Sequence, residues 1–599
     1  MEAGTAASST GSKTIADLMG RAAEKYGDAV ALRRKVDGSW VDVTYAEVGE
    51  VVSEIGRGLI DLGLGPGDRV SILCSTRPEW TYADFAVSAA GLTVVPVYPT
   101  NSPGECEWVV GNSESRAVVC ENAEQAAKIV EVRERLPALE HLIVIDASPE
   151  TEAAGAIALD ALRERGRARD AAELEARAAA VQAGDAYTFM YTSGTTGPPK
   201  GCVLTHGNYR SVLDMVQRRG GIGAGGDDVV YLFLPLAHAF ALLVQLGAFD
   251  AGATIAYWGG DTKQIIGELS EVQPTYLPSV PRIFEKLYSL VTAHGDPELI
   301  AGATKVGLEV RRLQAAGEPV PAELQEHYDG AEETLFKNVR AAFGGRLREA
   351  VTGAAPISKE ILEFFYACGV PVMEGYGMTE TATVATNSTP EQHRFGSIGK
   401  PLPGVEIRIA EDGELLVKGA NIFHGYYKND DASFGAVEDG WLHTGDLGSI
   451  DADGFVYITG RKKDIIITAG GKNLTPANLE NDLKQTRWVS QAVMHGDRRP
   501  YPVMLITLDE EEIVPWAQQQ GIEDTSIPAL AQHPAVRELI QGLLDEANAR
   551  YAPVEQVKKF FILDHDLSQE TGELTPTLKV KRNVVNERFA ERFEALYGT

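Results

Sequence analysis

Apolar positions along the first third of the chain alternate between two spacings. Residues 45–63 place apolar side chains three and four apart, as an amphipathic helix does, and the Gly/Pro cluster 63–67 ends that pattern. A short apolar run at 68–75 follows, then helical spacing at 77–91 and a second apolar run at 92–99. Alternation of strand and helix predicts parallel strands with helices packed on the faces of the sheet. The sequence therefore predicts an α/β fold of layered sheets and helices.

The most apolar region, residues 232–258, raises the question of a membrane span. Pro235, His238, Gln245 and Asp250 interrupt it, and a membrane-spanning helix tolerates few such residues. A buried strand followed by a buried helix explains the region better. The sequence therefore predicts no transmembrane segment, and it leaves peripheral contact with a membrane open.

Three further segments complete the predicted organisation. The Ala/Arg/Glu-rich stretch 160–183 has the composition of a single solvated helix, and residues 282–345 are rich in helical patterns. Beyond about residue 460 the character changes, and the chain closes with a charged strand-like stretch and a helix at 583–598. We expect a small α+β unit at the C-terminus.

Composition narrows the choice of partners and compartment. The 599 residues carry a formal net charge of -30, which disfavours nucleic acid and anionic lipid as partners. A small anionic substrate would then need a local basic group. The five cysteines form no CxxC pair, which favours a reducing compartment over disulfides or structural zinc. With no signal peptide at the N-terminus, we expect a cytoplasmic protein.

Residues 187–201, "YTFMYTSGTTGPPKG", combine a short apolar run with a loop of hydroxyls, glycines and one lysine. The apolar run predicts a buried strand, and the loop offers hydroxyls, approachable backbone N–H groups and the charge of Lys200. Those are the parts of a phosphate cradle. The spacing differs from the common G-x-x-x-x-G-K-[ST] loop, because two prolines separate Gly197 from Lys200.

Seven separated motifs occur in an order that resembles the adenylate-forming superfamily of acyl-CoA synthetases, luciferases and peptide-synthetase adenylation domains. The likeness extends from about residue 28 to the end of the chain. It implies a large N-terminal domain (1–460), which binds ATP and the acyl group, and a small mobile C-terminal domain (461–599). The motifs are "YTSGTTGPPKG" (191–201), "LPLAHAF" (234–240), "GAAP" (353–356), "GYGMTE" (375–380), "DGWLHTGD" (439–446), "GRKKD" (460–464) and "TPTLKVKR" (575–582).

The resemblance implies an ATP site built from five of these motifs. The loop at 192–200 would hold the β- and γ-phosphates, and Tyr376 would stack on adenine, with the backbone of "GAAP" on its other face. Asp446 would accept hydrogen bonds from the ribose hydroxyls, and Arg461 would assist at ribose or phosphate. The predicted ATP-binding residues are Thr192, Ser193, Gly194, Thr195, Thr196, Gly197, Lys200, Gly353, Ala354, Ala355, Gly375, Tyr376, Gly377, Thr379, Glu380, Asp446 and Arg461.

A magnesium site and a substrate gate are also implied. Glu380 is a hard oxygen ligand suited to Mg2+, with the Thr192 hydroxyl as a second ligand, and Mg2+ usually takes only one or two protein oxygens. His238 would line the path to the acyl carboxylate. A histidine in an apolar run is equally well explained as a satisfied core residue, so both interpretations stay open.

The resemblance assigns catalysis mainly to Lys579, which would bridge the substrate carboxylate and the α-phosphate, with Lys200 balancing charge on pyrophosphate. This chain has Leu578 where many relatives carry glycine. On a strand Lys581 would point to the same face as Lys579, so it stays a minor candidate for the role.

The motif at 460–464 is identified with the hinge between the two domains, with Lys463 at the hinge position. Here the chain has Gly460 where many relatives carry aspartate. The loop that would face CoA in the second half-reaction carries Gly470, Gly471 and Lys472.

The implied activity is that of a bacterial-type long-chain fatty acid–CoA ligase, with fatty acid, ATP and CoA as substrates and Mg2+ as cofactor. The alternative is a fatty acyl-AMP ligase that loads a carrier protein. The fatty-acid resemblance is carried by residues 439–464, by "PSVPRIFEKLY" (278–288) and by a helical insert at 295–345. The sequence predicts neither a chain length nor an oligomeric state, and the same chemistry serves degradation and biosynthesis.

Overall fold

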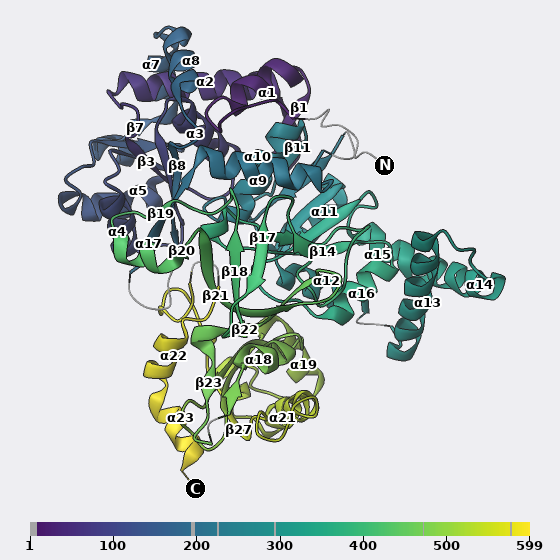
Figure 1. Ribbon diagram of the computed structural model, residues 1–599. Helices are drawn as coiled ribbons and strands as arrows, with labels where there is room; N and C mark the ends of the chain where they lie inside the picture. The colour runs from purple at the N-terminus through teal and green to yellow at the C-terminus, as the bar shows by residue number, and fades with distance from the viewer. Residues whose placement is uncertain are drawn as a thin grey trace.

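The molecule consists of a large N-terminal part and a smaller C-terminal part (Figure 1), as the sequence predicts. One extensive hydrophobic core gathers residues between 15 and 442, whereas separate cores lie within 466–562 and 493–597. The computed structural model describes residues 9–192, 198–223, 227–292, 295–470, 472–575 and 578–598.

The first sheet of the N-terminal part has eight strands in the order β19-β9-β8-β4-β3-β5-β6-β7. Its pairs from β8 through β7 are parallel, so the prediction from helix–strand alternation is confirmed. The strands are β3 (Arg69–Leu73), β4 (Thr93–Val97), β5 (Ala117–Cys120), β6 (His141–Val144), β7 (Ile157–Ala158), β8 (Ala186–Thr192), β9 (Lys200–Thr205) and β19 (Gly425–Tyr426). Helix α2 (Tyr45–Asp61) precedes β3, and α3 (Pro78–Ala89), α4 (Pro103–Ser113) and α5 (Ala123–Val132) connect the strands that follow.

The second sheet has nine strands in the order β16-β15-β14-β13-β12-β10-β11-β1-β2. Its parallel strands β10, β12, β13 and β14 bring their carboxyl ends to one edge, where ligands bind in open α/β sheets. The strands are β1 (Val30–Val36), β2 (Ser39–Thr44), β10 (Val229–Leu232), β11 (Thr254–Tyr257), β12 (Tyr276–Ser279), β13 (Glu349–Thr352), β14 (Val372–Tyr376), β15 (Thr386–Asn387) and β16 (Lys400–Pro401).

The apolar region 232–258 forms β10, the helix α10 (Ala239–Ala251) and β11. Helices α3 and α10 are apolar on all sides and almost wholly buried, as expected of helices enclosed within a core. The Thr81 hydroxyl of α3 hydrogen-bonds Gln245 of α10 (2.6 Å) and Tyr257 of β11 (2.5 Å), so α3 connects the two sheets. Within the described residues, no helix is both long and apolar enough to cross a bilayer.

The remaining N-terminal helices cover the sheets or project from them. Helices α13 and α14 extend away from the rest of the molecule at the right of Figure 1 and form part of the helix-rich segment 282–345. The remaining helices of the N-terminal part are α1 (Leu18–Tyr26), α9 (His206–Arg218), α11 (Ile265–Val272), α12 (Pro281–Thr292), α13 (Pro297–Ala316), α14 (Ala322–Ala331), α15 (Lys337–Ala342), α16 (Lys359–Ala367) and α17 (Asp430–Ala436).

The expectation of one solvated helix at 160–183 is wrong. The segment forms two helices, α7 (Leu159–Arg167) and α8 (Ala171–Ala180), and α7 packs along α2. Glu54 of α2 is buried and pairs with Arg163 (2.8 Å) and Arg167 (2.6 Å) of α7. The arginines that suggest a solvated face therefore have a buried carboxylate as their partner.

A five-stranded sheet leads from the N-terminal part to the C-terminal part. It contains β17 (Glu406–Ile409), β18 (Glu414–Lys418), β20 (Val437–Glu438), β21 (Trp441–Ile450) and β22 (Val456–Arg461). The C-terminal part follows with the hairpin β23 (Ile466–Ile467) and β24 (Asn473–Leu474), and with a sheet of β25 (Val489–His495), β26 (Val503–Leu508) and β27 (Lys559–Ile562). Its helices include α18 (Pro476–Lys484), α19 (Glu510–Gln519), α21 (Pro534–Asn548), α22 (Arg582–Arg588) and α23 (Ala590–Tyr597).

Candidate active site

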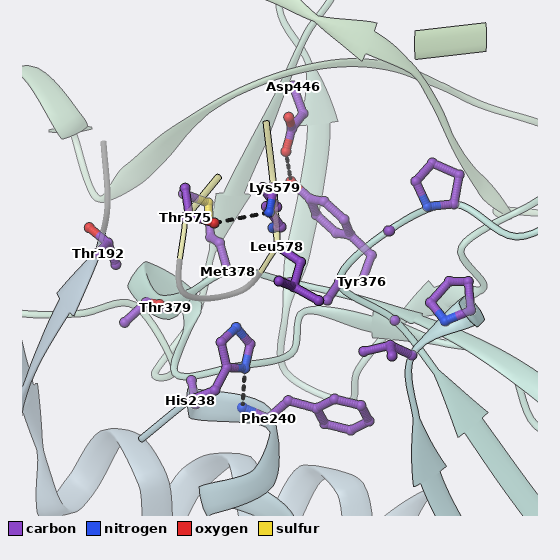
Figure 2. Close-up of a pocket in the computed structure, with 18 of the residues that line it drawn as sticks. Thr192, His238, Phe240, Tyr376, Met378, Thr379, Asp446, Thr575, Leu578 and Lys579 are labelled. Atoms are coloured by element: carbon purple, nitrogen blue, oxygen red, sulfur yellow. Dashed lines mark hydrogen bonds between the residues drawn. The ribbon is translucent and has the colours of Figure 1, made fainter. Parts of the chain in front are cut away.

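A cavity of about 1730 Å³ lies between the two parts of the molecule. Its walls come from the carboxyl ends of β8, β13 and β14, the N-terminus of α10, the strands β21 and β22, and residues 574–575 and 578–582 of the C-terminal part. Figure 2 shows Asp446, Tyr376, Lys579 and His238 around this space. Residues from distant parts of the sequence thus meet at one site.

Asp446 is the centre of a polar group at one end of the cavity. Its two carboxylate oxygens accept hydrogen bonds from the Tyr376 hydroxyl (2.6 Å) and the Arg461 guanidinium (2.8 Å). Arg461 faces Asp446 because the two residues are register partners on β21 and β22. The pKa of Tyr376 is raised well above its ordinary value by burial and by the charge of Asp446. Tyr376 is therefore a neutral hydrogen-bond donor with a fixed ring.

The turns after β13 and β14 lie close to each other, because a Cβ atom at Gly353 would lie 3.0 Å from the carbonyl oxygen of Gly375. Gly377 has no room for a side chain, because a Cβ atom there would lie 2.0 Å from the carbonyl oxygen of Thr383. Ala354 has a φ of +68°, a left-handed conformation that is uncommon for residues other than glycine. Gly353, Ala355, Gly375 and Thr379 also line the cavity, so the "GAAP" and "GYGMTE" motifs form adjacent walls.

Glu380 and Lys200 lie around the phenol of Tyr426. The Tyr426 hydroxyl donates to the Glu380 carboxylate (2.7 Å), and the Lys200 ammonium lies 5.0 Å from the centre of the Tyr426 ring. Glu380 is only 7 % exposed. Tyr426 therefore holds a carboxylate and an ammonium on the same side of the cavity.

Thr192 and Lys200 pair across the two strands that flank the Ser/Thr/Gly loop. Thr192 ends β8, Lys200 begins β9, and the two are register partners. Both residues line the cavity. Ser193, Gly194, Thr195, Thr196 and Gly197, predicted to bind phosphate, lie outside the described residues.

His238 is the residue that caps the N-terminus of α10. Its Nδ1 accepts a hydrogen bond from the backbone N–H of Phe240 (3.2 Å), and the ring points into the cavity (Figure 2). Burial and the nearby charge of Lys579 lower the pKa of His238 to about 4. His238 is therefore a neutral ring at physiological pH that is hydrogen-bonded to the helix it caps and faces the cavity.

Lys579 reaches the cavity from the C-terminal part. Its backbone N–H donates to the Thr575 hydroxyl (3.0 Å), and Leu574 pairs with Val580 across the turn that precedes it. The pKa of Lys579 is lowered by burial and by the charge of Arg461. Lys581 also lines the cavity, but its backbone N–H bonds to the carbonyl of Glu573 (2.7 Å) and it caps α22. Both lysines therefore line the cavity, and the charges of Asp446 and Glu380 act on Lys579.

The predicted hinge and CoA loop lie in different surroundings. Lys463 follows β22 in a single helical turn and lines the cavity, and its pKa is lowered by burial and by the charge of Arg461. Gly470 and Lys472 lie on an exposed loop and are not among the residues of the cavity wall. Gly471 lies outside the described residues. This arrangement therefore presents Lys579 to the site and leaves the described part of the CoA loop outside it.

Glu374 is a cavity residue that the motifs do not reveal. Burial raises the pKa of its carboxyl to about 8, so the group is mostly protonated at neutral pH and can both donate and accept. Its register partner on β13 is Thr352, whose buried hydroxyl has no hydrogen-bond partner among the described residues. Both residues line the cavity directly before Gly353 and Gly375. Only the position of Glu374 next to "GYGMTE" could have suggested it.

The comparisons with known proteins agree with this geometry. Residues 19–427 match the family described as AMP-binding enzyme, and residues 463–599 match the AMP-binding enzyme C-terminal domain. The chain is 39% identical over 583 residues to the long-chain-fatty-acid–CoA ligase FadD15 of Mycobacterium bovis, covering 95% of each chain. It is 32% identical to the long-chain-fatty-acid–CoA ligase ACSBG2 of Xenopus laevis, covering 98% of this chain and 84% of that one.

Solved structures share the fold. The crystal structure of the anthranilate CoA ligase AuaEII in complex with anthranoyl-AMP superposes with a TM-score of 0.73. The match covers 97% of this chain and 98% of that one at 21% identity. At that identity the likeness supports the fold alone, and it confirms the expected arrangement of a large N-terminal and a small C-terminal part.

Proposed function

The chain belongs to the AMP-binding enzyme family, and from that premise we propose that it is an ATP- and Mg2+-dependent long-chain fatty acid–CoA ligase. The observation that carries the proposal is the position of Lys579. It enters a cavity that has a polar group at one end, around Asp446, and an apolar channel starting at His238 at the other. A site of this kind can hold a nucleotide and a long acyl chain with a cation between them.

The apolar channel supports a long-chain substrate. One face of α10 lines it with residues three and four apart, and α9 faces that side. The polar Gln217 and Asp250 also line this wall. The apolar lining residues are Leu213, Val216, Ile222, Phe240, Leu243, Val244, Gly247 and Ala251. From His238 to Asp250 the helix advances about 18 Å at 1.5 Å per residue. An extended alkyl chain advances about 1.25 Å per carbon, so the channel matches an acid of about 14–16 carbon atoms.

The nucleotide would occupy the other end of the cavity. Tyr376 offers a ring face for adenine, and the protonated Glu374 carboxyl offers a donor and an acceptor for the edge of the base. Asp446 would accept hydrogen bonds from the ribose hydroxyls, which would replace those it now accepts from Tyr376 and Arg461. Arg461 would lie beside the ribose. Lys200, with the loop at 193–197, would face the phosphates.

The residues present fit a sparse Mg2+ site. The Glu380 carboxylate and the Thr192 hydroxyl both line the cavity and are hard oxygen ligands, which suit an ion that keeps several waters. When bound there, Mg2+ would neutralise phosphate charge.

In the first half-reaction the carboxylate oxygen of the fatty acid attacks the α-phosphorus of ATP, and pyrophosphate leaves with the electrons of the broken bond. Carboxylate is a weak nucleophile, so orientation and neutralisation of charge must supply the rate. Lys579 would contact the attacking carboxylate and the α-phosphate. His238 is neutral, so it would orient the carboxylate by hydrogen bonding without adding a charge.

In the second half-reaction the CoA thiolate attacks the carbonyl carbon of acyl-AMP and AMP leaves. We propose that the C-terminal domain, from residue 461 onward, rotates about Lys463. The rotation withdraws Lys579 and brings the loop of Gly470, Gly471 and Lys472 to the site. The exposed position of Gly470 and Lys472 supports a movement of this kind. We place the reaction in the cytoplasm, in keeping with five cysteines that are buried free thiols.

The test measures pyrophosphate, AMP and acyl-CoA formed from MgATP and saturated fatty acids of increasing length, with and without CoA. We expect CoA-dependent turnover with an optimum at about 14–16 carbons. The variant Gly247→Leu is the matched probe of the channel, because a Cβ at Gly247 fits between Leu213 and Ile222 at 3.7 Å. Its larger side chain should move the optimum to about 10 carbons, since Gly247 lies about 13 Å along α10 from His238.

Two results would change the assignment. Pyrophosphate release that stalls at bound acyl-AMP with or without CoA would indicate a carrier protein as the acceptor. A native optimum at acetate or at aromatic acids would contradict the long-chain assignment.

A further inference from the structure

A buried ion pair in the C-terminal part connects α18 to the start of α22. The Arg582 guanidinium donates to both oxygens of Glu480, at 2.7 Å and 2.8 Å. Glu480 also accepts from the backbone N–H of Met494 (2.6 Å), and Arg582 donates to the Met494 carbonyl (3.1 Å). The side chains of Arg582 and Glu480 are 19 % and 7 % exposed. A forked pair of this kind fixes direction as well as distance.

One member of the pair, Arg582, follows Lys579 closely in the sequence. Arg582 begins α22 three residues after Lys579, and Lys581 between them is bonded through its backbone to Glu573 (2.7 Å). The turn that carries Lys579 is thus held on one side by backbone pairing and on the other by Arg582. Glu480 belongs to a different helix, so it ties this turn to the body of the domain.

Lys579 needs such an anchor because opposing charges act on it. Arg461 and Lys463 disfavour its charge. Asp446 and Glu380 favour its charge. A flexible turn would let the ammonium move away from the two cations or toward one of these carboxylates, whether or not the substrates are bound. Because Arg582 fixes the turn, the ammonium stays at the reaction centre, where a displacement of about 1 Å lowers the rate strongly.

We propose that Glu480 and Arg582 are positioning residues for Lys579, required for formation of acyl-AMP and dispensable for its transfer to CoA. The inference rests on the proposed function, because it assigns Lys579 to the first half-reaction. Both residues line the cavity but are paired with each other, so we assign them an effect through Lys579 and not a direct contact with substrate. Their effect is therefore confined to the step that uses it, since the second half-reaction would proceed after Lys579 has been withdrawn.

The experiment separates the two half-reactions in the full-length protein. Formation of acyl-AMP from MgATP and palmitate is measured in single turnover, and CoA-dependent consumption of synthetic palmitoyl-AMP is measured separately. For Glu480→Gln and Arg582→Met we expect the first rate to fall about 10–100-fold and the second to stay within about twofold of the native rate. Arg582→Lys keeps the charge but loses the fork, so it should restore only part of the first rate.

Lys579→Ala is the reference, and the double variant Glu480→Gln/Lys579→Ala should be no slower in the first step than Lys579→Ala alone. A purely structural role would make the two losses add. Tyr551→Phe is the matched control: it removes a hydrogen bond to Asp482 on the same helix α18 (2.8 Å) but none to the Lys579 turn. We expect it to leave both half-reactions unchanged.

Three outcomes would overturn the inference. They are equal loss of both half-reactions with a lower unfolding temperature, unchanged rates in Glu480→Gln and Arg582→Met, and additive losses in the double variant. Failure of the proposed function gives a different result, because the native protein would then form no acyl-AMP from any fatty acid. In that case the same variants are compared on whichever carboxylic acid supports pyrophosphate release.

Discussion

Leu578 has a backbone conformation that glycine adopts without strain. Its φ is +58°, and its side chain is 65 % exposed, so little packing offsets the strain. A left-handed conformation costs an L-residue about 1–2 kcal/mol. The turn needs this conformation because the N–H of Leu578 bonds back to the carbonyl of Thr575 (2.8 Å) before the chain reverses into Lys579.

We therefore expect Leu578→Gly to raise the unfolding temperature of the C-terminal domain slightly. The gain should be below about 1 kcal/mol, because glycine also increases the entropy of the unfolded chain. Leu578→Val should lower the unfolding temperature, since β-branched residues tolerate this region worst. Thermal unfolding of the three full-length proteins provides the measurement. Equal unfolding temperatures for the Gly and Val variants would contradict the strain argument.

The motifs predict many of the residues of the site but miss those that depend on strand register. Every residue that is predicted for the ATP site and that the structure describes lines the cavity. The residue types within a motif determine its local chemistry, so this part of the site can be predicted from the sequence. Glu374 and Thr352 are 22 positions apart, and only the pairing of β13 with β14 places them together. The sequence contains no sign of that pairing, so their shared position in the cavity could not be predicted.

At the scale of the elements, Asp84 joins α3, α10 and β8 within the core. Its carboxylate accepts from the Tyr187 hydroxyl (2.8 Å) and from the Gln245 amide (2.8 Å). The residue is fully buried, and burial raises the pKa of its carboxyl to about 7. Two neutral donors therefore do not compensate for the loss of water around a carboxylate.

This pKa makes stability depend on pH in a defined direction. Between about pH 4 and about pH 7 the folded protein keeps the proton on Asp84 that the unfolded chain releases. Protonated Asp84 therefore adds to the free energy of unfolding below about pH 4. This contribution decreases by up to about 1.4 kcal/mol per pH unit as the pH rises, and it stays low above about pH 7.

Asp84→Asn should remove that dependence. The difference between the unfolding temperatures of the variant and the native protein should increase steadily from about pH 4 to about pH 7. Thermal unfolding across this pH range provides the measurement. Tyr187→Phe removes one donor that lowers the pKa of this carboxyl, so the loss of stability should continue to a higher pH than in the native protein. If the unfolding temperatures of the native protein and the Asp84→Asn variant change in parallel over the range, the assignment to Asp84 is wrong.

The sequence predicts elements far better than it predicts their pairing. Helix–strand alternation locates the strands from β3 to β6 and predicts that they are parallel, but it does not predict that β3 lies between β4 and β5 in the sheet. It also does not reveal that β1 pairs with β11, more than 200 residues away. The two helices at 160–183 escape prediction for a similar reason, since Glu54, the buried partner of Arg163 and Arg167 on α7, lies on α2.

At the scale of the whole molecule, ion pairs between α12 and the start of α19 join the two parts in the arrangement that presents Lys579 to the site. Arg282 of α12 pairs with Asp509, and Lys286 pairs with Glu511 of α19 at 2.7 Å. The pairs are partly exposed, so each contributes at most about 1 kcal/mol. Because rotation of the C-terminal domain would separate these residues, the pairs would favour the arrangement for the first half-reaction over the other.

Reversing both charges, in Arg282→Glu/Lys286→Glu, should therefore slow acyl-AMP formation about three- to tenfold and leave CoA-dependent consumption of synthetic acyl-AMP unchanged or faster. High salt should slow the first step in the native protein and have a smaller effect in the variant, since it screens the same exposed charges.

Arg312→Glu is the matched control, because Arg312 is an exposed arginine whose partner Glu309 lies on its own helix. Equal rates in the native and double-reversed proteins would mean that other contacts set the balance between the two arrangements. A fall in the second half-reaction alone would mean that these charges act after Lys579 has left the site.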